Sequence, residues 1–246
     1  MQKSEYKNIY ENENAHFYYL GMHYLVINLL KKYSPKKKLK ILDAGCGTGL
    51  LIKKLDKFGE VWGVDINVDA IKFAKSRGIK NLKKSSVTKL PFKDKYFDIL
   101  ISIDVLYHKW IKDDQKALKE FYRVLKPNGV LILKLPANEW LRGSHDITVM
   151  TRERYTKKSL ESKLKKNKFQ ILRISYFYFF ALPLVLFSRM LETFQKKASQ
   201  SDIKRIPRVL NNLLFYITKI EANLWFFLNL PTGVSLIAVA KKSNFN

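Results

Sequence analysis

The chain has 246 residues, of which 47% are hydrophobic and 13% aromatic, which suits one large globular core and excludes an intrinsically disordered chain. The net charge of +25 would attract anionic partners, although lysine bias explains the same value. The only cysteine, Cys46, rules out a disulfide within the chain and favours a reducing compartment. No signal peptide or spanning segment is evident, so we expect a cytoplasmic protein.

Strand and helix patterns alternate along most of the chain. Helices are predicted near 14–32, 50–58, 69–77, 113–124 and 156–166, the last with Thr156 as a possible N-cap, and strands at 39–45, 60–66, 82–87, 97–108, 130–136, 170–179 and 233–242. This alternation is typical of parallel βαβ units, and it predicts an α/β fold with a doubly wound, mostly parallel seven-stranded sheet. We expect a single domain, 1–246, made of a helical cap (1–35), a Rossmann-like core (36–181 and 233–246) and a helical insertion (182–232).

A glycine-rich loop follows the first predicted strand in the stretch ILDAGCGTG. Asp43 ends the strand, and glycines follow at positions 45, 47 and 49. The glycine spacing departs from the dinucleotide pattern G-x-G-x-x-G, and no Lys-Ser/Thr pair follows as in a phosphate-binding P-loop. Asp65 ends the second strand, where nucleotide-binding folds place an acid on the ribose hydroxyls. The loop therefore predicts a nucleoside ligand that brings no pyrophosphate.

Four ordered motifs between Leu39 and Pro136 resemble the class I S-adenosylmethionine-dependent methyltransferases with a UbiE/UbiG-like core: ILDAGCGTG, VWGVDI, LPFKDKYFDILISIDVLYH and FYRVLKPNGVLILKLP. The resemblance implies S-adenosylmethionine as the cofactor. It places the methionine part of the cofactor on Asp43, Gly45, Gly47 and Gly49, the ribose on Asp65, the adenine on Ile66, Ser86 and Val87, and the sulfonium and substrate near Ile103 and Asp104. Ser86 stands where the family usually has an Asp, so that polar contact is weakened.

Two further stretches resemble one subgroup of these enzymes that often accompanies glycan or lipid pathways. His16, Phe17 and Tyr18 match an N-terminal stretch that covers the cofactor, although the same residues would fit a core-facing helix. Later in the chain, His145, Asp146, Arg154 and Tyr155 match an H-D…R-R-Y-T segment, in which Glu153 replaces the first Arg and Met150-Thr151 replaces the usual Gly-His.

A catalytic base is expected beyond the fifth predicted strand. We predict that His145, assisted by Asp146, takes the proton of the acceptor. The same pair could instead form a hydrogen bond that fixes a loop. His108, at the end of the fourth predicted strand, is the competing candidate for the base. No metal site is predicted.

Three function classes follow from these patterns. The first is an O-methyltransferase that acts on a small-molecule, glycan or lipid-linked acceptor. The second is an RNA or other nucleic-acid methyltransferase, which the charge favours but the sequence IDVLYH does not, because it lacks the N/D-P-P-aromatic motif of base N-methylation. Cys46, inside the glycine loop, is not placed as a nucleophile for cytosine methylation. The third is a non-catalytic subunit with a methyltransferase fold, which the intact loop and Asp65 argue against.

The predicted insertion, 182–232, combines apolar segments with cations. Trp225 to Leu228 are four consecutive apolar residues that cannot all face one core, and five cations, Lys196, Lys197, Lys204, Arg205 and Arg208, lie between the apolar segments. Apolar faces bordered by cations are typical of proteins that rest on anionic membranes. We therefore hypothesise a peripheral enzyme on the inner face of the membrane, with Trp225 and Phe226 in contact with lipid; a dimer interface or an enlarged core is the alternative.

Overall fold

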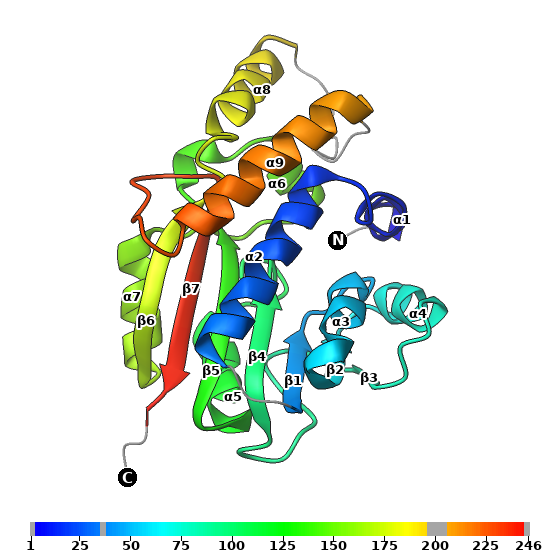
Figure 1. Ribbon diagram of the computed structural model, residues 1–246, viewed down its shortest axis with the longest axis vertical. Helices are drawn as coiled ribbons and strands as arrows, with labels where there is room; N and C mark the ends of the chain where they lie inside the picture. The colour runs from blue at the N-terminus through cyan, green and yellow to red at the C-terminus, as the bar shows by residue number, and fades with distance from the viewer. Residues whose placement is uncertain (1–2, 35–37, 196–205, 244–246) are drawn as a thin grey trace.

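The computed structural model describes residues 3–34, 38–195 and 206–243, and its centre is one seven-stranded sheet (Figure 1). The strands are β1 (Leu39–Ala44), β2 (Gly59–Asp65), β3 (Leu82–Lys84), β4 (Phe97–Ile103), β5 (Leu125–Pro136), β6 (Phe169–Phe177) and β7 (Ser235–Lys242). They lie in the order β3-β2-β1-β4-β5-β7-β6, and β7 runs in the direction opposite to the other six strands. The predicted fold class is confirmed.

Helices cover both faces of this sheet. One face carries α2 (Phe17–Tyr33), α3 (Leu50–Leu55), α4 (Val68–Ser76) and α9 (Arg208–Leu224), and the other carries α5 (Asp114–Val124) and α7 (Lys157–Lys166). A buried hydrophobic cluster lies on each face, as expected for a mostly parallel sheet with near-continuous apolar strands. The remaining helices are α1 (Lys3–Asn12), α6 (Ser144–Thr148) and α8 (Leu182–Gln195), and short 3-10 turns span Asp56–Phe58 and Glu139–Leu141.

The N-terminal region forms two helices where the periodicity predicts one. α1 ends at Asn12, and α2 begins after His16, whose ring nitrogen accepts a hydrogen bond from the Tyr18 N–H at 3.3 Å. This side-chain cap satisfies one of the amide donors that begin a helix. The break turns α1 away from α2 and across the loops that follow β1 and β2 (Figure 1).

Helices α2 and α9 pack closely side by side (Figure 1). Gly21 of α2 makes this possible, because a β-carbon at this position would lie 2.2 Å from the methyl group of Thr218 on α9. The end of α9 is anchored by Trp225, which is fully buried and lies 5.0 Å from the Arg173 guanidinium. The expectation that Trp225 contacts lipid is therefore wrong: this ring belongs to the core.

Candidate functional site

The carboxyl ends of β1, β2 and β4 open into one large cavity. Asp43 pairs with Gly63 on β2 and with Ile101 on β4, so the strand ends stand level at one edge of the sheet. The strand order reverses between β1 and β4, which is where open α/β sheets bind their ligands. The cavity has a volume of about 600 Å³ and continues from the loop after β1 to the space beside α8 and α9.

The glycine loop lines the first half of this cavity. Gly45, Gly47 and Gly49 all have φ between +52° and +90°, a range that L-residues with side chains rarely adopt. A β-carbon on Gly45 would clash with Val105, whereas one on Gly47 would enter open space beside the cavity. Gly49 lies outside the cavity lining and precedes α3 as its N-cap. The loop therefore presents bare backbone to a ligand mainly at Gly47.

Two buried acids define the charge of this half. The Asp65 carboxylate accepts hydrogen bonds from the N–H groups of Gly47 (3.0 Å) and Asn67 (2.8 Å), which hold it at the end of β2. Burial raises the pKa of Asp65, against the lowering effect of those amides. Burial, with Asp65 and Glu13 nearby, raises the pKa of Asp43 to about 7. Uncompensated acids of this kind favour a cationic ligand.

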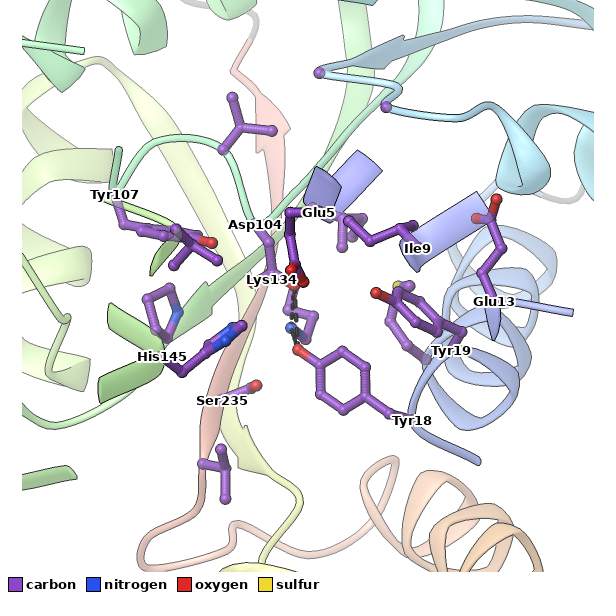
Figure 2. Close-up of a pocket in the computed structure, with 18 of the residues that line it drawn as sticks. Glu5, Ile9, Glu13, Tyr18, Tyr19, Asp104, Tyr107, Lys134, His145 and Ser235 are labelled. Carbon is purple, nitrogen blue, oxygen red and sulfur yellow. Dashed lines mark hydrogen bonds and ion pairs between the residues drawn. The ribbon is translucent and has the colours of Figure 1, made fainter. Parts of the chain in front are cut away.

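Helix α1 covers the same half from the solvent side: Glu5 and Ile9 on α1, and Glu13 just after it, line the cavity (Figure 2). Arg77 fastens this cover: it forms an ion pair with Glu13 at 2.6 Å, and its guanidinium lies 4.1 Å from the Tyr10 ring centre. Glu13 also accepts a short hydrogen bond from Thr48 in the glycine loop. The family resemblance predicts an N-terminal cover at His16–Tyr18, but it does not indicate α1, whose anchoring contacts join segments more than thirty residues apart.

The other residues implied by the family resemblance also lie at this edge. Ile66, Ser86, Val87, Ile103 and Asp104 all line the cavity, as do Asp43, Gly45, Gly47 and Asp65. Ser86 accepts a hydrogen bond from the Thr88 N–H at 3.2 Å, so the turn after β3 uses its hydroxyl locally. Val87 is buried, whereas Ile66 is exposed at the rim. The structure therefore brings together nine of the ten residues predicted to bind the cofactor.

Comparison with known proteins shows what the core of this chain is similar to. Residues 42–133 match the family model described as a methyltransferase domain. The Ubiquinone/menaquinone biosynthesis C-methyltransferase UbiE of Neisseria gonorrhoeae is 38% identical over 40% of this chain and 43% of its own length. The core is that of a class I S-adenosylmethionine-dependent methyltransferase.

Further relatives agree on the methyltransferase core. A probable tRNA methyltransferase 9B of Bos taurus is 37% identical over 40% of this chain and 22% of its own length. A solved structure of Haemonchus contortus phosphoethanolamine N-methyltransferase 2 in complex with S-adenosyl-L-methionine has a TM-score of 0.59 and 20% identity, covering 89% of this chain and 52% of that one. The chain spans less than half the length of the curated relatives it matches.

The cofactor of this methyltransferase core is S-adenosylmethionine, and the first half of the cavity fits it. The ligand is a sulfonium cation, and the half that would hold it is lined by Glu5, Glu13, Asp43 and Asp65. The open space beside Gly47 leaves room for a ligand against the backbone. Among the described residues, no cluster of His, Cys, Asp and Glu side chains could hold a metal ion.

The second half of the cavity contains a buried lysine that was not predicted from the sequence. Lys134 on β5 is 1% exposed, and its ammonium group reaches Asp104 and the Tyr18 hydroxyl (Figure 2). Asp104 follows β4, and Tyr18 is on the first turn of α2. The stretch VLILKLP carried a signal for this site, because a lone lysine interrupts an otherwise apolar buried strand.

The two residues of the predicted His145–Asp146 pair lie in different surroundings. Asp146 accepts two hydrogen bonds from Arg154, at 3.0 and 3.1 Å, and a third from the Gly143 N–H at 2.8 Å. These contacts lower the pKa of Asp146, against the effect of burial, and tie the loop after β5 to Arg154. His145 lines the cavity near Lys134 and Ser235 (Figure 2). His145 as the base stays a prediction, and Asp146 supports the loop through Arg154.

The competing histidine is held by a backbone contact. His108 Nδ1 lies 2.8 Å from the carbonyl oxygen of Val149. A carbonyl only accepts, so this nitrogen carries the proton. Burial lowers the pKa of His108 to about 4, which keeps the ring neutral at physiological pH. This contact anchors the loop after β4 to the segment after α6.

Helices α8 and α9 form the apolar wall of the second half. Leu184 and Val185 of α8 and Leu210 and Leu214 of α9 line the cavity. The same helices also expose apolar side chains to solvent: Phe187 and Met190 on α8, and Val209, Leu213, Tyr216 and Ile220 on α9. Lys196, Lys197, Lys204 and Arg205, the cations expected between the two apolar segments, lie outside the described residues. No helix in the described part of the chain is long and apolar enough to cross a bilayer.

Proposed function

We propose that the protein transfers the methyl group of S-adenosylmethionine to a hydroxyl oxygen of a small-molecule, glycan or lipid-linked acceptor, and that lipid-linked acceptors are preferred. The observation that carries this proposal is the continuity of the cavity, which joins an acidic half at Asp43 and Asp65 to an apolar half between α8 and α9. A cationic cofactor suits the first half, and a hydrocarbon chain suits the second.

The exposed surface of α8 and α9 supports a membrane location. Val209, Leu213, Tyr216 and Ile220 follow one another at spacings of three and four residues, so they form a stripe along one side of α9. An exposed apolar stripe beside the entrance of an apolar cavity is suited to receiving a chain from a lipid surface. We propose a cytoplasmic enzyme that docks on the inner face of the membrane through this surface.

The direct test is methyl transfer from labelled S-adenosylmethionine into a cell extract that is then divided into lipid, small-molecule, protein and RNA fractions. We expect label in the lipid fraction, attached to oxygen as judged by NMR of the purified product. Methyl attached to carbon would instead agree with the name of the UbiE relative and would overturn O-methylation. The absence of label in every fraction would favour a non-catalytic subunit.

RNA is the second candidate acceptor. A relative is named a probable tRNA methyltransferase, and the net charge of +25 would favour binding to a polyanion. In that case the label would enter the RNA fraction, would become acid-soluble on ribonuclease treatment, and would fall steeply as salt is raised. Label in RNA together with an unlabelled lipid fraction would contradict the lipid-linked proposal.

A further inference from the structure

The burial of Lys134, even in an ion pair with Asp104, is costly for a stable fold. Transfer of an ammonium group from water to a protein interior is repaid only by excellent partners, and well-packed apolar residues usually stabilise such a position better. Lys134 lies on β5, between β4 and β7 in the sheet, among leucine neighbours that follow the expected apolar pattern. Its charge therefore calls for an explanation other than stability.

Lys134 holds Asp104 in two ways. The Lys134 carbonyl accepts a hydrogen bond from the Asp104 N–H at 2.9 Å, and the Lys134 ammonium forms a short ion pair with the Asp104 carboxylate. Asp104 has φ of +55°, a left-handed conformation that is uncommon for a residue with a side chain. Such strain persists where surrounding contacts over-determine it, and it is typical of functional sites.

Tyr18 completes the support from the opposite wall. Its hydroxyl donates to Asp104 Oδ2 at 3.2 Å and accepts from Lys134 Nζ at 2.5 Å. The Tyr18 ring stacks on Tyr178 with ring centres 4.9 Å apart, which fixes its position. Two side chains from distant segments, Tyr18 and Lys134, thus contact one carboxylate oxygen of Asp104 (Figure 2).

The other oxygen of Asp104 is open. The hydrogen bonds within the described residues end on Oδ2 and none on Oδ1, and the side chain is 27% exposed where it lines the cavity. We propose that Asp104 is the catalytic residue that accepts the proton of the acceptor hydroxyl, and that Lys134 and Tyr18 are positioning residues for its carboxylate. This inference rests on the proposed function.

The reaction step balances with these groups. The acceptor oxygen gives its proton to Asp104 Oδ1 while it forms the bond to the methyl carbon, and the electron pair of the broken carbon–sulfur bond stays on sulfur. The proton on Asp104 then passes to water. A carboxylate at this position accepts hydrogen bonds from a hydroxyl but repels an anionic group, so the acceptor class is an alcohol or phenol on an apolar body.

The first test measures which charge the acceptor half prefers. Decylamine and decanoate share one chain length and carry opposite charges at neutral pH, so the ratio of their affinities reports the charge beside the chain. We would measure both by calorimetry on protein saturated with S-adenosylhomocysteine. Wild type should prefer decylamine. Asp104→Asn leaves Lys134 unpaired and should move the ratio toward decanoate by at least about tenfold, whereas Lys134→Met should move it toward decylamine by a similar factor.

A control separates charge from shape in this experiment. Ser235→Ala alters the cavity wall beside Tyr18 and Lys134 without a change of charge, and it should leave the ratio at the wild-type value. Tyr18→Phe keeps the ring stack and should shift the ratio less than either charge variant. A ratio that stays within about threefold of wild type in both Asp104→Asn and Lys134→Met would overturn the proposal.

The second test uses methyl transfer into the fraction that the wild type labels. Asp104→Asn should lower the rate by a factor on the order of 10² to 10⁴ while affinity for S-adenosylhomocysteine is retained. Lys134→Arg, which keeps the cation, should recover more activity than Lys134→Met. Wild-type activity in Asp104→Asn would overturn the role of this residue. If the wild type labels no fraction, the proposed function fails. The affinity ratios would still show whether the Asp104 carboxylate faces the bound ligand.

Discussion

Asp65 and Gly47 are the residues whose replacement tests the cofactor site most directly. Asp65→Ala removes a carboxylate that we expect to bind the ribose hydroxyls, and Gly47→Val places a branched side chain in the open space beside the loop. Each substitution should weaken S-adenosylhomocysteine binding by at least about tenfold: Asp65→Ala because hydrogen bonds to charged groups contribute about 1.5–3 kcal/mol each, and Gly47→Val because its side chain would occupy the space of the ligand. Calorimetric titration measures this. Asp56→Ala, which removes an exposed acid beyond α3, is the control and should bind normally.

A different outcome would change the assignment. Affinity equal to wild type in both Asp65→Ala and Gly47→Val would show that the cofactor binds elsewhere. A loss in Gly47→Val alone would keep the loop as the site and remove the ribose role from Asp65.

Asp43 should make the stability of the cofactor-free protein depend on pH. Burial raises the pKa of its carboxyl to about 7 in the folded state, against about 4 in an unfolded chain. The folded state therefore favours the protonated form, and its stability falls as pH rises through this window. Asp43→Asn removes the titration, so its advantage in unfolding free energy over wild type should grow by roughly 2–3 kcal/mol between about pH 5 and pH 8.

Urea unfolding at several pH values measures this difference. Asp56→Asn serves as the control, because that acid is exposed and its variant should follow the wild-type pH profile. An advantage for Asp43→Asn that stays constant with pH would show that the Asp43 carboxyl is not destabilised by burial.

Residues of the cofactor half were predictable, and residues of the acceptor half were much less so. Asp43 and Asp65 stand at fixed places relative to their own strands, so a local pattern is enough to find them. Asp104 and Tyr18 were each named from the family resemblance, but Lys134 and the link between the three were not predicted, because their contacts span 30 to 116 positions along the chain. Nothing in the local sequence around Tyr18 indicates a lysine partner on β5.

Helix α9 offers a test of how its C-terminal anchor stabilises the fold. Trp225 is 0% exposed, whereas Phe227, two residues later, is 81% exposed. Trp225→Ala should lower the free energy of unfolding by about 3–5 kcal/mol, because a buried aromatic ring leaves a cavity behind. Phe227→Ala is the matched control and should change it by less than about 0.5 kcal/mol. Urea unfolding of both variants measures the difference, and equal effects would contradict the packing of α9.

Strands and helices were predicted correctly where the hydrophobic pattern is clear, and they were missed in short or polar segments. All seven strands and the helix capped by Thr156 occur near their predicted positions, because apolar runs and caps are local signals. The helix predicted near 14–32 is α2, whereas α1 was missed, because its sequence KSEYKNIYEN is mostly polar. The five-residue helix α6 was also missed; it is too short to carry a period.

The whole molecule assembles one cavity from opposite ends of the chain. Helix α1 and the glycine loop form its acidic end, while α8 and α9, far along the sequence, form its apolar end. The strand edge at β1 and β4 joins the two, with Asp104 between them. This arrangement separates a site for a cationic cofactor from a site for an apolar acceptor. The same helix α9 lines the apolar end through Leu210 and Leu214 and carries the exposed apolar stripe.

That stripe leads to a prediction about membrane binding. Phe187→Ser combined with Leu213→Ser removes one exposed apolar side chain from α8 and one from α9. Each buried apolar side chain contributes roughly 1.5–3 kcal/mol at a lipid interface, so the double variant should bind vesicles at least tenfold more weakly. Co-sedimentation with vesicles of phosphatidylglycerol and phosphatidylcholine measures this. Wild-type binding should require the anionic lipid and weaken as salt is raised, because the charge of the chain is +25.

Leu172→Ser is the matched control, because Leu172 is exposed at the irregularity of β6 and belongs neither to α8 nor to α9. This variant should sediment with vesicles as the wild type does. An equal loss in Leu172→Ser and in the double variant would mean that general hydrophobicity, and not the α8–α9 surface, drives binding. Wild-type protein that stays in the supernatant at low salt would end the membrane proposal. The cavity between α8 and α9 would then have to receive its acceptor from solution, which favours a small molecule or glycan over a lipid-linked chain.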